Sequence, residues 1–366
     1  MIVIATQTFA PAKGGMEAYM TGLAEHLCSR KFETFVFADE AKTDYSPSCD
    51  YTLFRFGGWR PWRRMKKRIA ITKFAHDHSI EGIFCDSWKS VEAVPMNTRC
   101  PIAAFAHGSE FPSKPSIFKR KRIEKALARC SAIIANSQYT ANAARAFLPD
   151  NDTRLVVINP PIDPIPPASE AANQKIAALL KGKKPVISTI ARLEPRKGAD
   201  RVIMAIPNLA KKHPDVVFLI GGDGEDKQRL QDLAEKLNVS DRVVFHGWVN
   251  DADTKAAILS HSDVFAMPAY RVGSSVEGFG ISYVEAAWFG VPSVAGNDGG
   301  AADAVTDGKT GILCDASDFQ EVGKALDKIL SDIELRSRMS DDARHKAETE
   351  HTWTTALPLM LTALHQ

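Results

Sequence analysis

Short runs of apolar and β-branched residues recur through the second half of the chain, with longer amphipathic segments between them. In residues 199–213 and 225–239 the apolar positions follow the three-to-four spacing of a helix that buries one face. The apolar runs have the length and composition of buried strands. They lie at residues 185–191, 216–222, 243–249, 264–269, 291–296 and 310–315. This alternation predicts a parallel sheet with helices on both of its faces.

The first half of the chain shows the same alternation less regularly. A strand at residues 1–6 precedes a helix at 15–30, and later strands are expected at residues 34–39, 82–86, 102–108, 132–137 and 155–161. Between the halves, residues 159–170 contain five prolines, which favour a stiff interdomain linker. We therefore predict two doubly wound, Rossmann-like α/β domains facing each other across a cleft, with ligands at the carboxyl ends of their strands.

Length and composition agree with this organisation. The 366 residues suffice for two domains with full cores, and 45% hydrophobic and 25% charged residues are typical of a globular protein. The net charge of +2 gives no general reason to expect nucleic acid as a partner. The six cysteines form no Cys-x-x-Cys pair, so structural thiols in a reduced cytosol are the simplest account. We expect neither a signal peptide nor a membrane span.

Two carboxylates, Glu277 and Glu285, flank a short segment containing Gly278, Phe279 and Gly280. Burying a carboxylate is costly unless it is paired, and glycines before a helix let backbone amides approach an anion. A helix beginning near Gly280 would place Glu285 about one and a half turns inside, where it could reach a ligand over the helix terminus. The alternative is that Glu277 only complements the helix dipole and Glu285 is solvated.

Basic residues follow the strand at 185–191. Arg192, Arg196 and Lys197 lie in the loop that leads to the next helix, a position suited to a diphosphate. A solvated basic turn is the alternative. The glycine-rich turn at residues 221–225 lacks a complete Gly-x-Gly-x-x-Gly pattern and is weak evidence by itself.

The first half contributes two further candidates. Gly14 and Gly15 connect the first strand to its helix, as a loop that approaches phosphate or sugar or simply as a tight turn. His107 ends a strand and precedes Gly108, which places an imidazole at the rim of the expected cleft, although a structural histidine is the alternative. Together with the basic loop and the two acids, these residues favour a site for a nucleotide diphosphate sugar.

Motifs along the whole chain resemble those of glycosyltransferase family 4, whose members have the GT-B fold. They are GGMEAYMTGLAEHL, AHG, ANSQYT, INPPID, ARLEPRKG, GGDGE, FHGWV, the segment at residues 263–305 and GKTGIL. The resemblance implies an N-terminal acceptor-binding domain of residues 1–163 plus 352–366 and a nucleotide-sugar domain of residues 164–351. It also implies sugar transfer with retention of configuration and no metal or other cofactor.

Residue roles follow from the same resemblance. Glu285 resembles the acid that binds the donor ribose, and Glu277 the acid that faces the donor sugar. Arg192 and Lys197 match the pair that neutralises the leaving diphosphate, and His107 matches a histidine near the reacting carbon. The amides that resemble those lining sugar and phosphate belong to Gly278, Phe279, Gly280 and Ile281. Front-face attack and a covalent double displacement both remain open.

Segments 269–286 and 297–311 most resemble mannosyltransferases that use GDP-mannose to build phosphatidylinositol mannosides and bacterial envelope glycans. The resemblance implies transfer of a hexose, with mannose favoured, to a membrane lipid or to lipopolysaccharide or exopolysaccharide. The loop Arg271 to Val276 is shorter and less glycine-rich than theirs. The alternatives are a transferase that uses a UDP-sugar, a sugar-nucleotide epimerase of the same fold, or a non-catalytic nucleotide-sugar sensor.

Two basic segments suggest how the acceptor is reached. Residues 59–74 interleave Trp59 and Trp62 with arginines and lysines, and residues 114–127 are also basic. Such segments suit an anionic membrane surface, with an ordinary solvated face as the alternative. We therefore expect a cytoplasmic protein that binds peripherally at the inner face of the cytoplasmic membrane.

Overall fold

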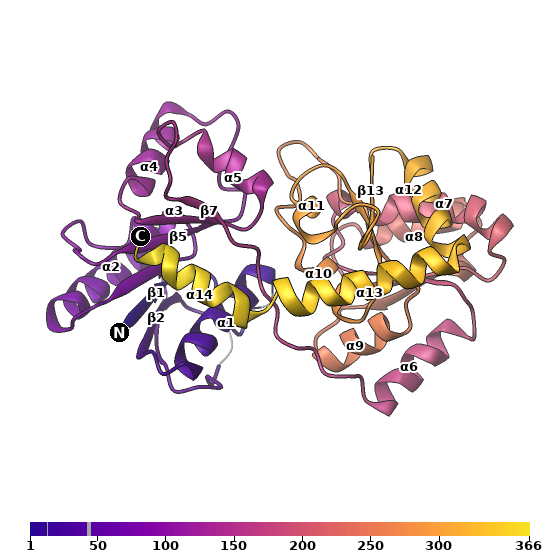
Figure 1. Ribbon diagram of the computed structural model, residues 1–366, viewed down its shortest axis with the longest axis horizontal. Helices are drawn as coiled ribbons and strands as arrows, with labels where there is room; N and C mark the ends of the chain where they lie inside the picture. Colours follow the sequence, from indigo (N-terminus) through magenta and orange to yellow (C-terminus); the bar gives the residue numbers. More distant parts are fainter. Residues whose placement is uncertain (13, 42–44) are drawn as a thin grey trace. The chain divides into compact units, whose positions relative to one another are not determined.

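The computed structural model describes residues 1–12, 14–41 and 45–366. The chain forms two compact units: the N-terminal unit is Met1–Asp163 with Trp353–Gln366, and the C-terminal unit is Pro164–Thr352 (Figure 1). The N-terminal sheet has the strand order β3-β2-β1-β4-β5-β6-β7, and the C-terminal sheet has the order β10-β9-β8-β11-β12-β13. Every strand pair is parallel, so the predicted α/β fold class is confirmed.

The N-terminal sheet contains one strand that the sequence analysis missed. Its strands are β1 (Ile2–Ala5), β2 (Thr34–Asp39), β3 (Thr52–Phe56), β4 (Gly82–Cys85), β5 (Ile102–Ala106), β6 (Ala132–Ala135) and β7 (Leu155–Val157). The missed strand is β3, which pairs with β2 at the edge of the sheet. Its sequence TLFRF contains an arginine, and no residue in it is fully buried, so it lacks the continuous apolar run of the inner strands.

Helices cover both faces of the N-terminal sheet. They are α1 (Gly15–Ser29), α2 (Arg60–Asp77), α3 (Trp88–Val91), α4 (Ile117–Leu127), α5 (Gln138–Arg145) and α14 (Trp353–Leu364). One core joins α1 and α14, and a separate core joins the other four helices. The last helix fits closely, because a Cβ at Gly22 would lie 2.5 Å from the Trp353 ring.

The C-terminal unit confirms all six strands predicted for the second half of the chain. They are β8 (Val186–Ile190), β9 (Val217–Gly221), β10 (Val243–Gly247), β11 (Val264–Met267), β12 (Ser293–Gly296) and β13 (Gly311–Cys314). Its helices are α6 (Glu170–Leu180), η1 (Pro195–Lys197), α7 (Ala199–Lys212), α8 (Lys227–Lys236), η2 (Ser240–Arg242), α9 (Ala252–Ser260), α10 (Ile281–Trp288), α11 (Ala301–Ala304), α12 (Phe319–Ser331) and α13 (Ile333–Glu350). Apolar side chains from the strands, α7 and α12 form its largest core.

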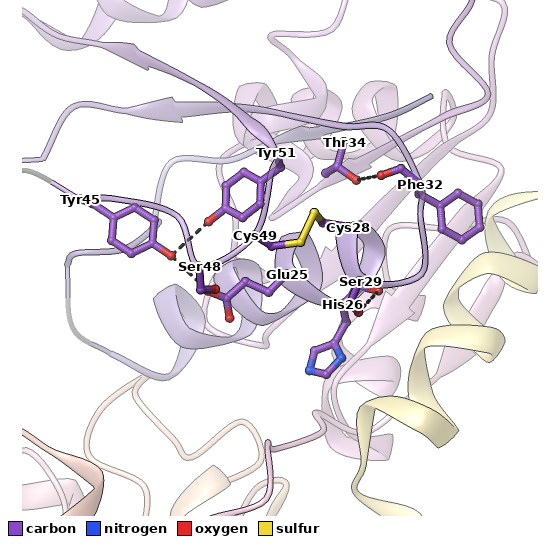
Figure 2. Close-up of a disulfide and its surroundings, with 10 residues drawn as sticks. All are labelled: Glu25, His26, Cys28, Ser29, Phe32, Thr34, Tyr45, Ser48, Cys49 and Tyr51. Atoms are coloured by element: carbon purple, nitrogen blue, oxygen red, sulfur yellow. Dashed lines mark hydrogen bonds between the residues drawn. A yellow bond between two sulfur atoms is a disulfide. The ribbon is translucent and has the colours of Figure 1, made fainter.

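The expectation that all six cysteines are thiols is wrong. Cys28, in the last turn of α1, forms a disulfide with Cys49 in the connection from β2 to β3 (Figure 2). The two are 21 residues apart, and the fold brings them together because residues 45–51 of this connection lie beside α1. Short-range cysteine spacing therefore could not indicate the pair. Cys85, Cys130 and Cys314 are buried thiols and Cys100 is half-buried. Among the described residues, no helix combines the length and apolar character needed to span a membrane.

Candidate active site

The basic loop after β8 packs directly on the loop after β11. Gly198 has φ +74°, and a Cβ there would lie 2.0 Å from the backbone oxygen of Pro268, so the contact requires glycine. A backbone hydrogen bond of 3.0 Å from the Tyr270 amide to the Arg196 carbonyl joins the same two loops. This close approach brings the basic residues beside the segment that carries Glu277.

Glu277 is held by two cations. Its Oε2 accepts hydrogen bonds from Arg196 Nη1 at 2.7 Å and from Lys197 Nζ at 2.6 Å. Only 12% of the Glu277 side chain is exposed. Burial acts to raise the pKa of Glu277, but Lys197 and Arg196 outweigh it, so the pKa lies below the usual 4.5. Glu277 is therefore an ionised carboxylate at neutral pH.

Arg192 lies farther out in the same loop. Its Nη1 is 3.3 Å from Glu194 Oε1, and 60% of its side chain is exposed. Arg196 also donates through Nε to Glu194 Oε2 at 2.9 Å, so this arginine bridges two carboxylates. The sequence places Arg196 in the predicted basic loop but gives no reason to assign Glu194 a role there. Nothing in the sequence distinguishes which of the adjacent Arg196 and Lys197 faces Glu277, and in the structure both do.

Glycines position the backbone on both sides of Glu277. The Gly300 amide donates to the Glu277 carbonyl at 2.9 Å, and a Cβ at Gly299, which has φ +100°, would lie 2.4 Å from that oxygen. The predicted helix start is confirmed, because α10 begins at Ile281 after Gly280, which has φ +93°. Phe279 is buried, and its ring contacts that of His351. The first amides of a helix have no carbonyl partner within the helix, so this terminus suits an anion.

Glu285 is the second predicted acid, and it lies inside α10. Its Oε1 accepts a hydrogen bond from Lys255 Nζ of α9, and 16% of its side chain is exposed. The sequence does not single out Lys255, because a lysine on a helix is usually solvated. Both predicted acids thus pair with lysines from neighbouring elements.

His107 follows β5 in the N-terminal unit. Its amide donates to Glu110 Oε1 at 2.7 Å, and its Nε2 lies 3.0 Å from the Asp86 carbonyl oxygen. Because a carbonyl only accepts, Nε2 carries the hydrogen, and the lone pair of the neutral ring is on Nδ1. The carboxylate of the buried Asp86 accepts from Thr6 Oγ1 and the Gln7 amide, which fixes the start of the connection from β1 to α1.

Gly14 and Gly15 end that same connection. Helix α1 begins at Gly15, and no side chain caps it at Gly14. Since β1 is adjacent to β4 and β4 to β5, these glycines and His107 follow parallel strands at one edge of the N-terminal sheet. His107, Gly14 and Gly15 belong to the N-terminal unit, whereas the other predicted site residues belong to the C-terminal unit.

The sequence pattern predicts that the cations of the basic helix α2 face solvent. In the structure, some of them face the protein instead. Lys67 Nζ bonds to Asp39 Oδ1 at 2.5 Å and to the Thr6 carbonyl, and Arg63 Nε lies 2.8 Å from Asp39 Oδ2. Burial lowers the pKa of Lys67. The exposed apolar side chains of this helix and its N-cap are Trp59, Trp62, Met65 and Ile69.

The fold is that of the two-domain GT-B glycosyltransferases. A crystal structure of Anabaena HepE with UDP matches with a TM-score of 0.81 at 21% identity, covering 100% of this chain and 99% of that one. WaaG, a glycosyltransferase involved in lipopolysaccharide biosynthesis, matches with a TM-score of 0.71 at 18% identity, covering 98% of each chain.

Sequence comparison defines the family. The family model described as Glycosyl transferases group 1 matches residues 171–346, and the Glycosyltransferase Family 4 model matches residues 13–165. A GDP-mannose-dependent alpha-(1-6)-phosphatidylinositol monomannoside mannosyltransferase of Mycolicibacterium smegmatis is 30% identical over 97% of this chain and 95% of its own. A Corynebacterium glutamicum enzyme that acts on the monoacylated lipid is 27% identical over 96% and 94%. The chain belongs to glycosyltransferase family 4 and is a hexosyltransferase.

Proposed function

We propose that this enzyme transfers mannose from GDP-mannose, with retention of configuration, to a membrane lipid or cell-envelope glycan such as lipopolysaccharide or exopolysaccharide. The observation that carries the proposal is the ionised Glu277 held between Arg196 and Lys197 beside the start of α10. The relatives that match nearly the whole chain are named for GDP-mannose, which supports the choice of donor.

The donor residues divide between sugar and nucleotide. Glu277 accepts hydrogen bonds from hydroxyls of the donor sugar. Glu285 accepts them from the ribose hydroxyls once Lys255 has moved away from its carboxylate. The amides from Gly278 to Ile281 face the phosphates at the start of α10. Arg192, Arg196 and Lys197 carry three positive charges against two on Glu194 and Glu277, so the loop favours an anionic diphosphate.

Catalysis is mainly electrostatic in this proposal. As the glycosidic bond breaks, negative charge grows on the diphosphate, where Arg192 and Lys197 stabilise it. The diphosphate accepts the proton of the acceptor hydroxyl, which attacks from the face that the diphosphate leaves. The loop cations take the role that a divalent ion has in other transferases, so no metal is required. The family resemblance implies a role for His107 near the reacting carbon, for which its Nδ1 lone pair is suited. A double displacement is the alternative mechanism.

The acceptor is reached at an anionic membrane. Helix α2 exposes Trp62, Met65 and Ile69, and its N-cap Trp59 is also exposed. Two exposed apolar residues, Ile117 and Phe118, begin α4, which carries several lysines and arginines. Aromatic and basic side chains on one surface suit the interfacial region of a bilayer, so we propose peripheral binding at the inner face of the cytoplasmic membrane.

Slow hydrolysis of nucleotide sugars tests the donor. Incubating the protein separately with GDP-mannose, GDP-glucose, UDP-glucose and UDP-galactose, with and without EDTA, should release GDP fastest from GDP-mannose, and EDTA should not change the rate. Preferential cleavage of a UDP-sugar would overturn the choice of donor. Complete loss in EDTA with recovery in manganese would overturn metal independence. Release of an epimerised nucleotide sugar would contradict transfer itself.

A further inference from the structure

A cavity of about 510 Å³ lies in the N-terminal unit, apart from every predicted site residue. Its volume is within the range of about 300–1,000 Å³ that is usual for small-molecule pockets. Glu40 directly follows β2 and Arg55 lies near the end of β3, so these two lining residues lie at the carboxyl edge of the sheet. The residues that line it and enter the argument are Glu40, Tyr45, Pro47, Tyr51, Leu53 and Arg55.

Two charged side chains, those of Glu40 and Arg55, line the cavity. Arg55 donates through Nη1 to the Asp39 carbonyl at 3.0 Å and through Nη2 to the Ala10 carbonyl, which fixes the guanidinium without cancelling its charge. In the part of the chain that the structure describes, neither Arg55 nor Glu40 forms an ion pair within 4.0 Å. A guanidinium has five N–H groups, so Arg55 retains donors and Glu40 retains acceptors for a ligand.

Two tyrosines form a fixed wall of the cavity. Tyr45 donates its hydroxyl hydrogen to Glu25 Oε1 at 3.2 Å, so the 3.1 Å contact between the two hydroxyls has Tyr51 as its donor. Both rings meet Phe9 edge-on, with centroids at 6.2 and 6.1 Å. The wall therefore offers aromatic surface and hydroxyl lone pairs in set positions (Figure 2).

The disulfide ties this wall to α1. Cys49 lies between Tyr45 and Tyr51 in the chain and is bonded to Cys28 of α1, and Ser48 donates to Glu25 of the same helix. Phe9, against which the wall packs, belongs to the connection that ends at Gly14. The tyrosine wall of the cavity therefore packs against the connection from β1 to α1.

We propose that this cavity binds one sugar unit of the acceptor, an inference that rests on the proposed glycosyl transfer. A sugar ring presents hydroxyls that both donate and accept, together with apolar C–H faces. Arg55 supplies donors, Glu40 supplies acceptors, and Pro47, Leu53 and the tyrosines supply apolar surface. The carboxylates of Glu40 and the nearby Glu25 oppose a phosphate, so the ligand is an uncharged sugar and not a phosphorylated headgroup.

Saturation-transfer NMR with the methyl α-glycosides of mannose, glucose and galactose, in excess GDP, tests this inference. At least one glycoside should bind the wild type. Glu40→Gln should weaken it about tenfold or more, because a hydrogen bond to a charged group is lost. Tyr51→Phe, which removes one hydroxyl, should weaken it about two- to tenfold. Glu33→Gln, which changes an exposed acid just before β2, is the matched control and should bind like the wild type.

A variant without the disulfide tests the contribution of the tyrosine wall separately from that of the charged residues Glu40 and Arg55. Cys28→Ser with Cys49→Ser should weaken the glycoside and leave the affinity for GDP unchanged, because the nucleotide residues belong to the other unit. If none of the three glycosides binds, or if Glu40→Gln binds them as well as the wild type does, the inference is wrong. GDP binding by the same protein would still support the proposed function. If mannose 1-phosphate binds more tightly than the glycosides, and Glu40→Gln strengthens its binding further, the ligand of the cavity is an anion and not an uncharged sugar. Loss of GDP binding by the wild type would instead contradict the proposed function.

Discussion

Glu277 keeps its negative charge in a buried position because Arg196 and Lys197 of one loop both face it. Removing either cation leaves the other, whereas removing the carboxylate leaves two like charges side by side. The Arg192 side chain is 60% exposed and pairs with Glu194, not with Glu277. The three cations of this loop therefore have different roles, although they are close in sequence.

Lys197→Ala should lower turnover by about 100-fold or more and weaken GDP-mannose binding much less, because the cation matters most when charge on the leaving diphosphate is greatest. Steady-state transfer kinetics and titration calorimetry with GDP measure the two effects. Lys183→Ala is the matched control, since Lys183 pairs with Asp241 elsewhere in the same unit. Unchanged turnover with weaker binding would make the loop a docking site only.

The two acids should fail differently. Glu285→Gln should weaken GDP binding by about 1.5–3 kcal/mol, the value of a hydrogen bond to a charged group, because Glu285 binds the ribose. Glu277→Gln should leave GDP binding nearly unchanged and abolish transfer, because its ligand is the sugar. Calorimetry with GDP beside a transfer assay separates them. Equal loss of GDP affinity in both variants would contradict the assigned roles.

Glu277 also predicts a pH dependence of stability. Its pKa is below 4.5 in the folded protein, so between that pKa and 4.5 the unfolded chain binds more protons and stability rises with pH. The contribution is complete above 4.5 and is lost as the pH falls through the folded pKa. The difference in melting temperature between wild type and Glu277→Gln should therefore be constant near pH 7 and shrink toward pH 3. A difference that does not change with pH would contradict the ion pairs.

At the scale of elements, α2 separates cations that hold the fold from cations that face solvent. Arg63 and Lys67 form ion pairs with Asp39 at the end of β2, whereas Arg60, Lys66 and Arg68 are exposed. The sequence shows only a basic segment, because every one of these residues is an arginine or lysine. Their orientation depends on where the helix packs against the sheet.

Replacing Arg60, Lys66 and Arg68 by serine should release the protein from anionic vesicles, with about 1 kcal/mol lost per cation, and should leave GDP-mannose hydrolysis intact. Vesicle co-sedimentation at two salt concentrations measures this release. The matched control replaces Lys181, Lys236 and Lys309, which are exposed in the C-terminal unit. Lys67→Ser should instead lower the melting temperature, because the largely buried carboxylate of Asp39 then keeps only its ion pair with Arg63. Equal vesicle binding by triple variant and wild type would contradict membrane docking by α2.

The sequence predicted most elements because their patterns are local. The apolar runs of the C-terminal unit and the glycine before α10 gave the strands and the helix start correctly. The edge strand β3 was missed because half-exposed residues and Arg55 interrupt its pattern. The disulfide and the pairing of Glu285 with Lys255 were missed because they join residues that only the tertiary fold brings together.

At the scale of the whole molecule, the chain passes between its two units twice, after Asp163 and after Thr352. The proline-rich composition of residues 159–170 predicts the first passage. Only the family resemblance predicts the second, since no proline or glycine cluster marks it. The candidate residues Glu277, Arg196 and Lys197 follow from motifs. The supporting Glu194, Asp86 and Glu110 depend on contacts that only the structure reveals.

Helix α14 has a consequence for the order of folding during synthesis. Its Trp353, Leu357 and Leu364 are buried in the core that also contains α1, so the N-terminal unit lacks part of its interior until α14 has been synthesised. The C-terminal unit, which is continuous in sequence, needs no later segment. The nascent N-terminal unit therefore exposes the apolar surface of α1 while the C-terminal unit is synthesised, and it is the part that a ribosome-bound chaperone would protect.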